Sequence, residues 1–541
     1  MVVEVVLAIQ TPPIVLQMAA VIVNQILDKY SVFHYINVNV NIMNAIIHPT
    51  NEVLEFLGGP QKKKDGVKYR LCNLLEFVEM NGIKLIYNGL TQSFVSVNNF
   101  EYQEFLNLKT EKDFVDFMFR NYFMVPEDWN EGELIRKYRK EHEIKLDENY
   151  LKNPSQYTIL TTTACNARCF YCYEKGVKKK TMTIETADKI ADFIIKNYKA
   201  DEKKQDVSIG WFGGEPLVNI KVIDHICNKL KENGVVFHSN FTSNSYLFND
   251  ENADKALNDW NVNNIQVTLD GTERMYNAAK NYVYDKEKNG SPFEIVISNI
   301  NRLLDRNISI SVRMNMDMYN ADDMLKLVDV LVEKIPNKNK FGAYCYPLFD
   351  GYGISRGVDA QWEVLKKAEE ISDKLEKNGL NNQNGIRRGI SIHHCMVDGG
   401  NEILFAPDGH MGLCEHYTEN NFIGHIDKPT EYDWDTVAKF KEQILDRDLC
   451  NTCPCFSNCV RLKMCEDLRN CNEPVKWWNR NRLKASMREE YKKFVSNSRN
   501  GQQYTTTEIL TQLNDISNRL AKIDDRFKDI ENRIDNLENK D

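Results

Sequence analysis

Residues 161–174 read TTTACNARCFYCYE and follow a β-branched run, Tyr157 to Thr163, that predicts a strand. The three cysteines of this loop, Cys165, Cys169 and Cys172, stand at positions n, n+4 and n+7. Zinc sites and most iron–sulfur clusters take four protein ligands, so three thiolates in one tight loop indicate a [4Fe–4S] cluster with one open iron. The alternative is a set of packed or zinc-binding cysteines.

Composition limits the class of protein. The chain has 541 residues, enough for three or more domains, and its 42% hydrophobic and 27% charged content is ordinary for a globular protein. A formal net charge of −9 argues against a general nucleic-acid binder. The fourteen cysteines cluster, with three at 165–172 and six at 450–471, which indicates metal sites in a reducing compartment rather than disulfides.

The N-terminal residues do not read as a targeting or membrane segment. They are apolar to about Val23 but include Glu4 and the pair Pro12-Pro13, and no basic region precedes them. We therefore expect a cytoplasmic protein that does not bind membranes.

Residues 1–60 predict a small α/β unit. We expect a strand at Val2–Ile9, a helix from Pro13 to about Tyr30, a second strand at Phe33–Val40 and a helix at Ile42–Leu57. The stretch Gly58–Gly66 is the predicted linker to the next unit.

Residues 67–150 predict a hairpin followed by helices. The runs Ile83–Tyr87 and Phe94–Val97 flank Asn88-Gly89, and helices are expected near 101–106, 111–121 and 131–142. This order resembles the winged-helix element that binds leader peptides in peptide-modifying enzymes, in which a hairpin edge accepts a peptide as an added strand. A scaffolding domain is the equal alternative.

Residues 151–350 alternate between strands and amphipathic helices. This pattern predicts a parallel sheet in a partial (β/α)6 barrel of the TIM type, with function at the C-terminal ends of the strands. The expected strands are Tyr157–Thr163, Val207–Phe212, Val235–Phe241, Ile265–Leu269, Ile308–Met316 and Phe341–Pro347.

Polar and glycine residues end these strands in order. Paired glycines allow close approach of the backbone, Glu215 can accept hydrogen bonds from an ammonium, and Arg313 and Asn315 share one strand face. The candidate ligand-binding residues from this reasoning are Gly213, Gly214, Glu215, Arg313 and Asn315.

Residues 395–471 hold eight cysteines. Cys395 and Cys414 are spaced C-x13-G-x4-C, and Cys450, Cys453 and Cys459 follow as C-x2-C-x5-C, before Cys465 and Cys471. A structural zinc ribbon is the alternative to iron–sulfur clusters here.

Together these motifs resemble the radical S-adenosylmethionine (SAM) enzymes that carry a C-terminal SPASM extension. The resemblance covers about residues 155–480. It implies that the Cys165/Cys169/Cys172 cluster binds SAM through its open iron and that the GGE motif at 213–215 binds the SAM amino group. It also implies that further residues complete the SAM site together with Arg313 and Asn315, namely Tyr171, Ser243, Asn244, Thr268 and Asp270. Ser245 stands where the family's TNG segment has glycine.

The resemblance also implies two auxiliary [4Fe–4S] clusters, making three in all. One set would be Cys450, Cys453, Cys459 and Cys471, and the other Cys395, Cys414 and Cys465, with an open iron or with the surplus Cys455 as fourth ligand. Five residues, rather than the usual three, separate Cys459 from Cys465. Glu415, directly after Cys414, matches the position of a general base in sulfatase-maturing relatives; a merely exposed carboxylate is the alternative.

The C-terminal tail has a heptad pattern. Apolar residues follow a 3-4 spacing that predicts a coiled coil at 505–541 and self-association. They are Leu513, Ile516, Leu520, Ile523, Phe527, Ile530, Ile534 and Leu537.

These features lead to one functional hypothesis and two alternatives. The resemblance implies a peptide maturase in which a 5′-deoxyadenosyl radical removes a hydrogen to install a crosslink, most simply a thioether, in a ribosomally made precursor peptide, with flavodoxin or ferredoxin as electron donor. The alternatives are an anaerobic sulfatase-maturing enzyme that makes formylglycine and a non-catalytic iron–sulfur scaffold. The expected domains are 1–60, 67–150, 151–350 (barrel), 351–485 (SPASM) and 505–541.

Overall fold

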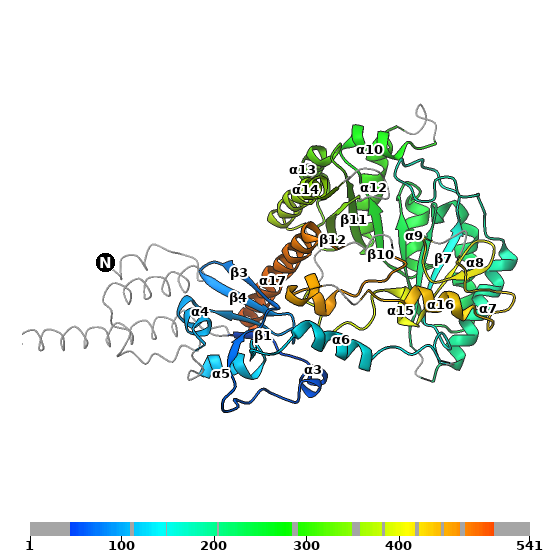
Figure 1. Ribbon diagram of the computed structural model, residues 1–541. Helices are drawn as coiled ribbons and strands as arrows, with labels where there is room; N and C mark the ends of the chain where they lie inside the picture. The colour runs from blue at the N-terminus through cyan, green and yellow to red at the C-terminus, as the bar shows by residue number, and fades with distance from the viewer. Residues whose placement is uncertain are drawn as a thin grey trace, which may run out of the picture. The chain divides into compact units, whose positions relative to one another are not determined.

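The structure is a computed structural model (Figure 1). It describes residues 44–108, 113–147, 149–202, 205–283, 290–348, 357–380, 385–416, 421–444, 448–465 and 471–501. The strands and helix predicted within residues 1–43 and the coiled coil predicted at 505–541 lie outside the described residues.

A parallel sheet forms the centre of the chain. Its six parallel strands pair in sequence order from β7 to β12. They are β7 (Gln156–Thr162), β8 (Val207–Gly213), β9 (Phe237–Ser243), β10 (Val262–Thr268), β11 (Ser309–Met316) and β12 (Phe341–Pro347). The predicted partial (β/α)6 barrel is confirmed, with strand ends displaced by a few residues.

Helices connect consecutive strands, as parallel pairing requires. The helices are α7 (Ile184–Ala200), α8 (Ile220–Glu232), α9 (Asp250–Asn258), α10 (Glu273–Lys280), α12 (Pro292–Asp305), α13 (Ala321–Lys334) and α14 (Gly357–Lys377). Along β9 buried and half-buried residues alternate, and the buried Trp211 and Phe241 on neighbouring strands lie in one continuous core. The C-terminal strand ends therefore lie together at one edge.

The cysteine-rich region continues this sheet rather than forming a separate one. Strand β13 (Glu402–Phe405) runs parallel to β7, and β14 (His410–Gly412) and β15 (Gly424–His425) add antiparallel strands. The remaining elements of this region are α15 (Met396–Gly399), α16 (Trp434–Lys441), η3 (Asp448–Thr452), η4 (Phe456–Asn458) and α17 (Glu473–Gly501).

A smaller antiparallel sheet lies before the barrel. Its order is β1-β5-β4-β3, formed by β1 (Asn44–Ile47), β3 (Leu75–Met80), β4 (Ile83–Asn88) and β5 (Phe94–Val97). The predicted hairpin of β4 and β5 is confirmed, and so are the helices α4 (Asn99–Leu106), α5 (Asp113–Arg120) and α6 (Glu131–Glu141). A short pair, β2 (Tyr69–Leu71) with β6 (Met124–Pro126), completes this region.

Three features of this region differ from expectation. The predicted helix at Ile42–Leu57 is wrong at its start, because β1 occupies residues 44–47 and Thr50 caps a shorter helix α3 (Asn51–Phe56) directly after Pro49. Strand β3 was missed, although Asn81-Gly82, both at positive φ, form the turn that joins it to β4. A peptide was expected to join an exposed edge of the hairpin, but both of its outer edges are paired within the chain, β5 with β1 and β4 with β3.

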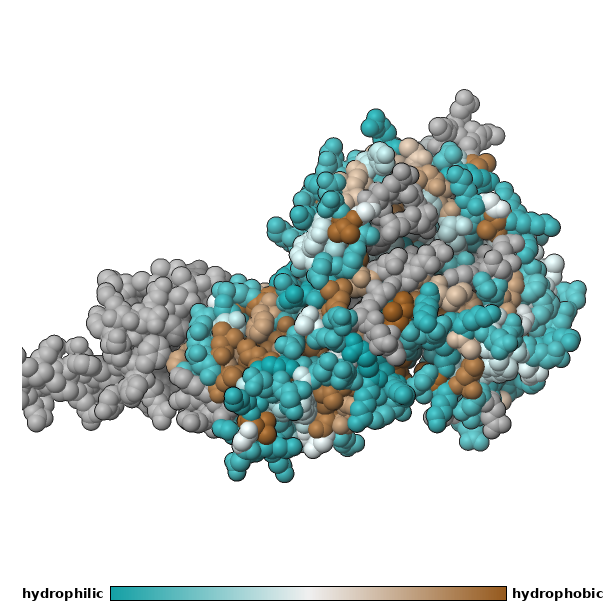
Figure 2. All heavy atoms as spheres, viewed as in Figure 1, coloured by the Kyte–Doolittle hydropathy of each residue, from teal (hydrophilic) through white to brown (hydrophobic). Residues whose placement is uncertain are grey.

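On the face shown in Figure 2, the surface of the described residues is mainly hydrophilic, and apolar side chains gather over the small sheet and its helices. Helix α4 exposes Phe100 (49%) and Leu106 (37%). Within the described ranges, no helix has the length and apolar character needed to cross a bilayer.

Candidate active site and cysteine clusters

The loop after β7 holds its three cysteines by backbone contacts to the next strand. Gly214 N donates to Thr162 O at 3.0 Å and Glu215 N to Ala164 O at 3.1 Å, which ties the loop to the end of β8. A Cβ on Gly213 would lie 2.1 Å from Thr162 O, and one on Gly214 would lie 2.6 Å from Ala164 O. The paired glycines are thus required by the loop backbone, and not only by a ligand.

The three cysteines of the loop, Cys165, Cys169 and Cys172, lie close together. Burial raises the pKa of Cys165 most, and the negative charges of Glu215, Cys169 and Cys172 raise it further. Ala167 N donates to Cys165 Sγ at 3.3 Å, as backbone donors do for metal-bound thiolates. In the described part of the chain, no three His, Cys, Asp or Glu side chains are gathered around the position of a single ion. A [4Fe–4S] cluster does not need its ligands gathered around one ion, because each thiolate binds a different iron. The three thiols of this loop fit that arrangement.

Glu215 is a fully buried carboxylate at the end of β8. It accepts hydrogen bonds from Ser243 Oγ at 2.8 Å, Asn244 N at 2.9 Å and Leu217 N at 3.3 Å. Burial raises the pKa of Glu215 to about 7, and the hydrogen bonds only partly oppose this rise. The structure therefore brings together Glu215, Ser243 and Asn244 as predicted, in a site where a ligand's ammonium would favour the ionised carboxylate.

Asn244 connects this carboxylate to the cysteine loop. Its Nδ2 donates to Asn166 Oδ1 at 2.7 Å and lies 3.9 Å from Cys165 Sγ. Ser245, the departure from the family's glycine, has φ of 62°, in the left-handed region that glycine adopts freely. The substitution thus keeps the backbone conformation of the glycine.

A second buried network joins the ends of β10 and β11 to the loop. Tyr171 OH donates to Asp270 Oδ2 at 2.6 Å, and Asn315 Nδ2 donates to Asp270 Oδ1 at 3.1 Å. Lys280 Nζ lies 2.9 Å from Asp270 Oδ2 and donates to Thr268 Oγ1 at 2.6 Å and Tyr171 OH at 2.8 Å. Three predicted residues therefore contact one lysine, and the fourth, Asn315, joins them through Asp270 and Tyr171.

Lys280 was missed by the sequence analysis. It ends α10 and is 2% exposed, and its carbonyl accepts from Arg168 N at 2.8 Å. A lysine in the last turn of a helix is ordinarily solvated and interacts with the helix dipole, so no local signal marks this one as buried.

Arg313 lies beside this network. Its Nε donates to Asn315 Oδ1 at 2.9 Å, and its guanidinium lies 3.7 Å from the centroid of the Tyr346 ring. It is half-buried, so its remaining donors are available to a carboxylate ligand.

Cys395, Cys414 and Cys465 lie together as one set. The charge of Cys465 raises the pKa of both Cys395 and Cys414, and the charge of Cys395 also raises the pKa of Cys414. The negative charge of Glu415 also raises the pKa of both Cys395 and Cys414. Tyr173, which follows Cys172, stacks on His416 with ring centroids 4.6 Å apart. The first auxiliary set therefore lies beside the radical-cluster loop.

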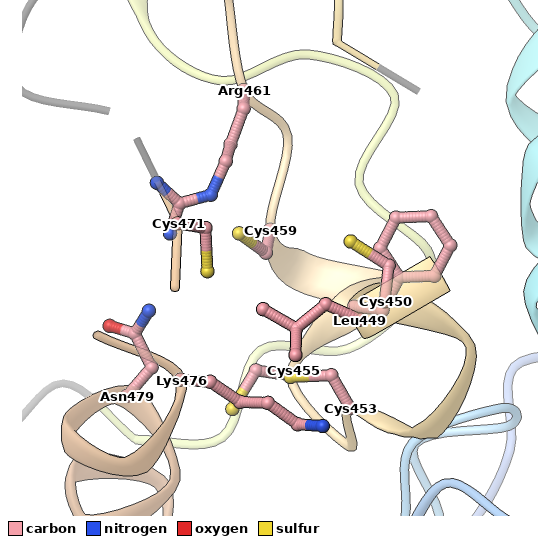
Figure 3. Close-up of a pocket in the computed structure, with 10 residues that line it drawn as sticks. Leu449, Cys450, Cys453, Cys455, Cys459, Arg461, Cys471, Lys476 and Asn479 are labelled. Atoms are coloured by element: carbon pink, nitrogen blue, oxygen red, sulfur yellow. The ribbon is translucent and has the colours of Figure 1, made fainter. Parts of the chain in front are cut away.

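The second set surrounds one pocket (Figure 3). The side chains of Cys450, Cys453, Cys459 and Cys471 line it, as the sequence pattern predicts. Cys455 lines the same pocket and hydrogen-bonds Cys453. Cys455 therefore lies with the second set, contrary to the expectation that it could complete the first.

Two arginines near this pocket were also missed. Arg461 lines it and hydrogen-bonds Cys459, and burial lowers the pKa of the Arg139 guanidinium to about 10 while Cys459 and Cys450 oppose that shift. Arg139 belongs to α6, more than three hundred residues earlier in the chain, so no local pattern could associate it with these cysteines.

Comparison with known proteins agrees with the site. Residues 159–331 match the family model of the Radical SAM superfamily, which covers β7 to most of α13 and includes the three-cysteine loop. The chain is a radical SAM enzyme. Enzymes of this class use a [4Fe–4S] cluster and SAM, which the Cys165/Cys169/Cys172 loop and the strand-end residues fit.

Several characterised proteins are similar to parts of the chain. A GTP 3′,8-cyclase from Clostridium perfringens is 24% identical over 296 residues, covering 50% of this chain and 84% of that protein. The radical SAM cyclopropyl synthase TigE from Paramaledivibacter caminithermalis is 24% identical over 348 residues, covering 56% of this chain and 73% of TigE.

Two solved structures are similar at lower identity. The anSMEcpe structure with bound AdoMet has 14% identity and a TM-score of 0.46, covering 64% of this chain and all of that chain. Streptococcus suis SuiB bound to the precursor peptide SuiA has 13% identity and a TM-score of 0.42, covering 72% of this chain and 94% of SuiB.

Proposed function

We propose that this radical SAM enzyme is a peptide maturase that removes a hydrogen from a ribosomally made precursor peptide and installs a crosslink, most simply a thioether. The observation that carries this proposal is the position of the first auxiliary cysteine set beside the SAM-cluster loop, where Tyr173 stacks on His416. Two further cysteine sets give the site more redox centres than SAM cleavage alone requires.

The residues of the barrel would bind and orient SAM. Glu215, with Ser243 and Asn244, would receive the ammonium, and Arg313 would meet the carboxylate. Asp270, Asn315 and Tyr171 would hold the ribose side of the ligand. When bound, the cluster supplies the electron that splits SAM into methionine and the 5′-deoxyadenosyl radical. A C–H bond offers no charge to stabilise, so the chain contributes positioning and exclusion of water.

The two auxiliary sets would each hold a [4Fe–4S] cluster. Cys395, Cys414 and Cys465 would leave one iron open, since Cys455 lies at the other set. A substrate thiolate is a chemically suitable fourth ligand, which favours a cysteine of the peptide as the sulfur partner in a crosslink.

Peptide recognition is proposed for residues 67–150. Because β1 already pairs with β5, the exposed apolar side chains of α4, Phe100 and Leu106, are a better candidate contact than the β5 edge. Flavodoxin or ferredoxin is the proposed electron donor.

Formylglycine formation in a sulfatase is the second candidate. Glu415 favours this function, because it lies near Cys414 and Cys395 and its negative charge also raises the pKa of Tyr173. A candidate carboxylate base therefore lies near both the first auxiliary set and the SAM-cluster loop. TigE is named a cyclopropyl synthase, so a test of this chain must also distinguish products with a new carbon–carbon bond.

The first experiment measures iron, sulfide and SAM cleavage in anaerobically reconstituted protein, wild type against a Cys165/Cys169/Cys172→Ala triple variant. Three clusters require about twelve irons per chain, with about four fewer in the variant, and only the wild type should produce 5′-deoxyadenosine. Iron near zero, or no SAM cleavage by wild type, would overturn the proposal.

The substrate test adds peptides encoded beside the gene, analysed by mass spectrometry. Loss of two hydrogens, with a thiol no longer open to alkylation, supports a thioether. Conversion of a cysteine or serine to an aldehyde instead supports formylglycine formation.

A further inference from the structure

We propose that Arg139 of helix α6 is a positioning residue for the second cysteine set. It holds the loop that carries those cysteines and supplies a buried positive charge to the anionic cluster they bind. This inference rests on the proposed cluster at Cys450, Cys453, Cys459 and Cys471, and it gives the region before the barrel a role in an iron–sulfur site.

The guanidinium of Arg139 joins two segments of the cysteine-rich region. Its Nη2 donates to Phe456 O at 2.7 Å and Ser457 O at 3.2 Å, between Cys455 and Cys459. Its Nε donates to Ser391 O at 2.9 Å, four residues before Cys395. The same group lies 4.8 Å from the centroid of the Phe456 ring. One side chain thus fixes the backbone on which Cys459 is placed.

The charge of Arg139 has no carboxylate partner in the part of the chain that the structure describes. The side chain is 4% exposed, and its three acceptors are neutral carbonyls. Other buried charges here are paired, such as Glu131 with Arg70 and Glu76 with Arg480. Burying an unpaired cation is costly, so an anionic partner is expected nearby.

The cysteine set is the place for that partner. Cys459 and Cys450 are the groups whose negative charge favours the charged form of Arg139, and Arg136 is the group that opposes it. A [4Fe–4S] cluster with four thiolates carries net negative charge, and neighbouring charges and hydrogen bonds are the means by which a protein sets its potential. Arg461 lies at the same pocket, as Figure 3 shows.

Further contacts hold the same loop to the region before the barrel. Gly89 approaches so closely that a Cβ there would lie 2.4 Å from Pro454 O. Gln92 Nε2 donates to Asn458 Oδ1 at 3.2 Å, and Arg136 Nη2 donates to Asn451 Oδ1 at 2.8 Å. The hairpin tip and α6 therefore hold the 450–459 loop from one side, with Arg139 as the buried charge in the contact.

The test uses the full chain in the Cys165/Cys169/Cys172→Ala background, reconstituted anaerobically, so that only auxiliary clusters remain. Arg139→Gln removes the charge, Arg139→Lys keeps it with fewer donors, and Lys140→Gln removes an exposed cation from the same helix. Iron per chain, the electron paramagnetic resonance signal after reduction and its midpoint potential are measured. A Cys459→Ala variant identifies the signal of the second set.

We expect Arg139→Gln either to lose about four irons per chain or to keep the cluster at a more negative potential, because removing a cation disfavours the reduced state. Arg139→Lys should retain both iron and potential better than Gln, and Lys140→Gln should match the parent. Equal behaviour of the Gln and Lys variants, or a Gln variant that changes only the melting temperature, would overturn the proposal. A parent protein without the Cys459-dependent signal would instead refute the cluster itself.

Discussion

At the scale of single residues, Glu215 sets a pH dependence. Its pKa of about 7 in the folded chain lies above its ordinary value of 4.5. Between these values the folded chain binds more protons than the unfolded chain, so this residue lowers the free energy of unfolding as pH rises, by on the order of 3 kcal/mol across the window. A bound ammonium would stabilise the carboxylate and expel the proton.

We therefore predict that SAM binding at about pH 6 releases a proton, and that Glu215→Gln abolishes this release and weakens SAM binding about tenfold or more, the size of a lost charge-assisted hydrogen bond. Calorimetry in buffers of different ionisation enthalpy measures both. The control is Glu369→Gln, which removes a half-buried carboxylate whose pKa is also about 7, on α14 and outside the site. Proton release that persists in Glu215→Gln would contradict the assignment.

Ser245 holds strain that glycine would remove. Its φ of 62° costs a non-glycine residue about 1–2 kcal/mol, and its buried Oγ has no partner among the described residues. Ser245→Gly should therefore raise the free energy of unfolding by about 1 kcal/mol in urea denaturation. Asn307→Gly, at the same φ but with a residue that tolerates it, should change stability less. A destabilised Ser245→Gly would refute the strain argument.

At the scale of elements, the Lys280–Asp270 pair joins α10, the end of β10 and the cysteine loop. Both side chains are at most 2% exposed, so removing one partner leaves an uncompensated buried charge. Lys280→Met should cost about 3–5 kcal/mol of unfolding free energy, and Lys280→Met with Asp270→Asn should recover much of it. Denaturant titration of a double-mutant cycle measures the coupling.

The control for that cycle is Lys189→Met, which removes an exposed ion pair and should cost less than about 1 kcal/mol. If Lys280→Met lowered the free energy of unfolding no more than Lys189→Met, the buried pair would contribute no more to stability than an exposed pair does. Additive costs in the double variant would likewise contradict the coupling.

Elements were predictable where the periodicity is local. The alternating burial along β9 and the amphipathic α7 and α8 follow from residue patterns within single segments. β13 was not predictable as part of the barrel sheet, because its parallel pairing with β7 joins residues about 250 positions apart. The missed β3 had a local signal, Asn81-Gly82, that the expected Asn88-Gly89 turn obscured.

At the scale of the whole molecule, the predicted coiled coil makes a separate claim, on residues outside those described. Removing residues 502–541 should lower the molar mass measured by light scattering, because fewer chains would then associate. SAM cleavage should stay within about twofold of wild type, because the barrel holds the SAM site. Ile523→Asp, at a core heptad position, should act like the truncation, and Asp525→Asn, at an outer position, should not. An unchanged mass for the truncated chain would refute self-association through this segment.

The sequence by itself determined the class of chemistry. The patterns that determined it are short-range: three cysteines in one loop, GGE at the next strand end, and strands alternating with helices. Each can be recognised without knowing which distant segments it contacts. Only the tertiary structure decided which distant residues complete the sites: Lys280 beneath Tyr171, Cys455 at the second cysteine set, and Arg139 against the 450–459 loop. The reason is physical, since burial and charge pairing depend on contacts between segments far apart in the chain, which no local spacing records.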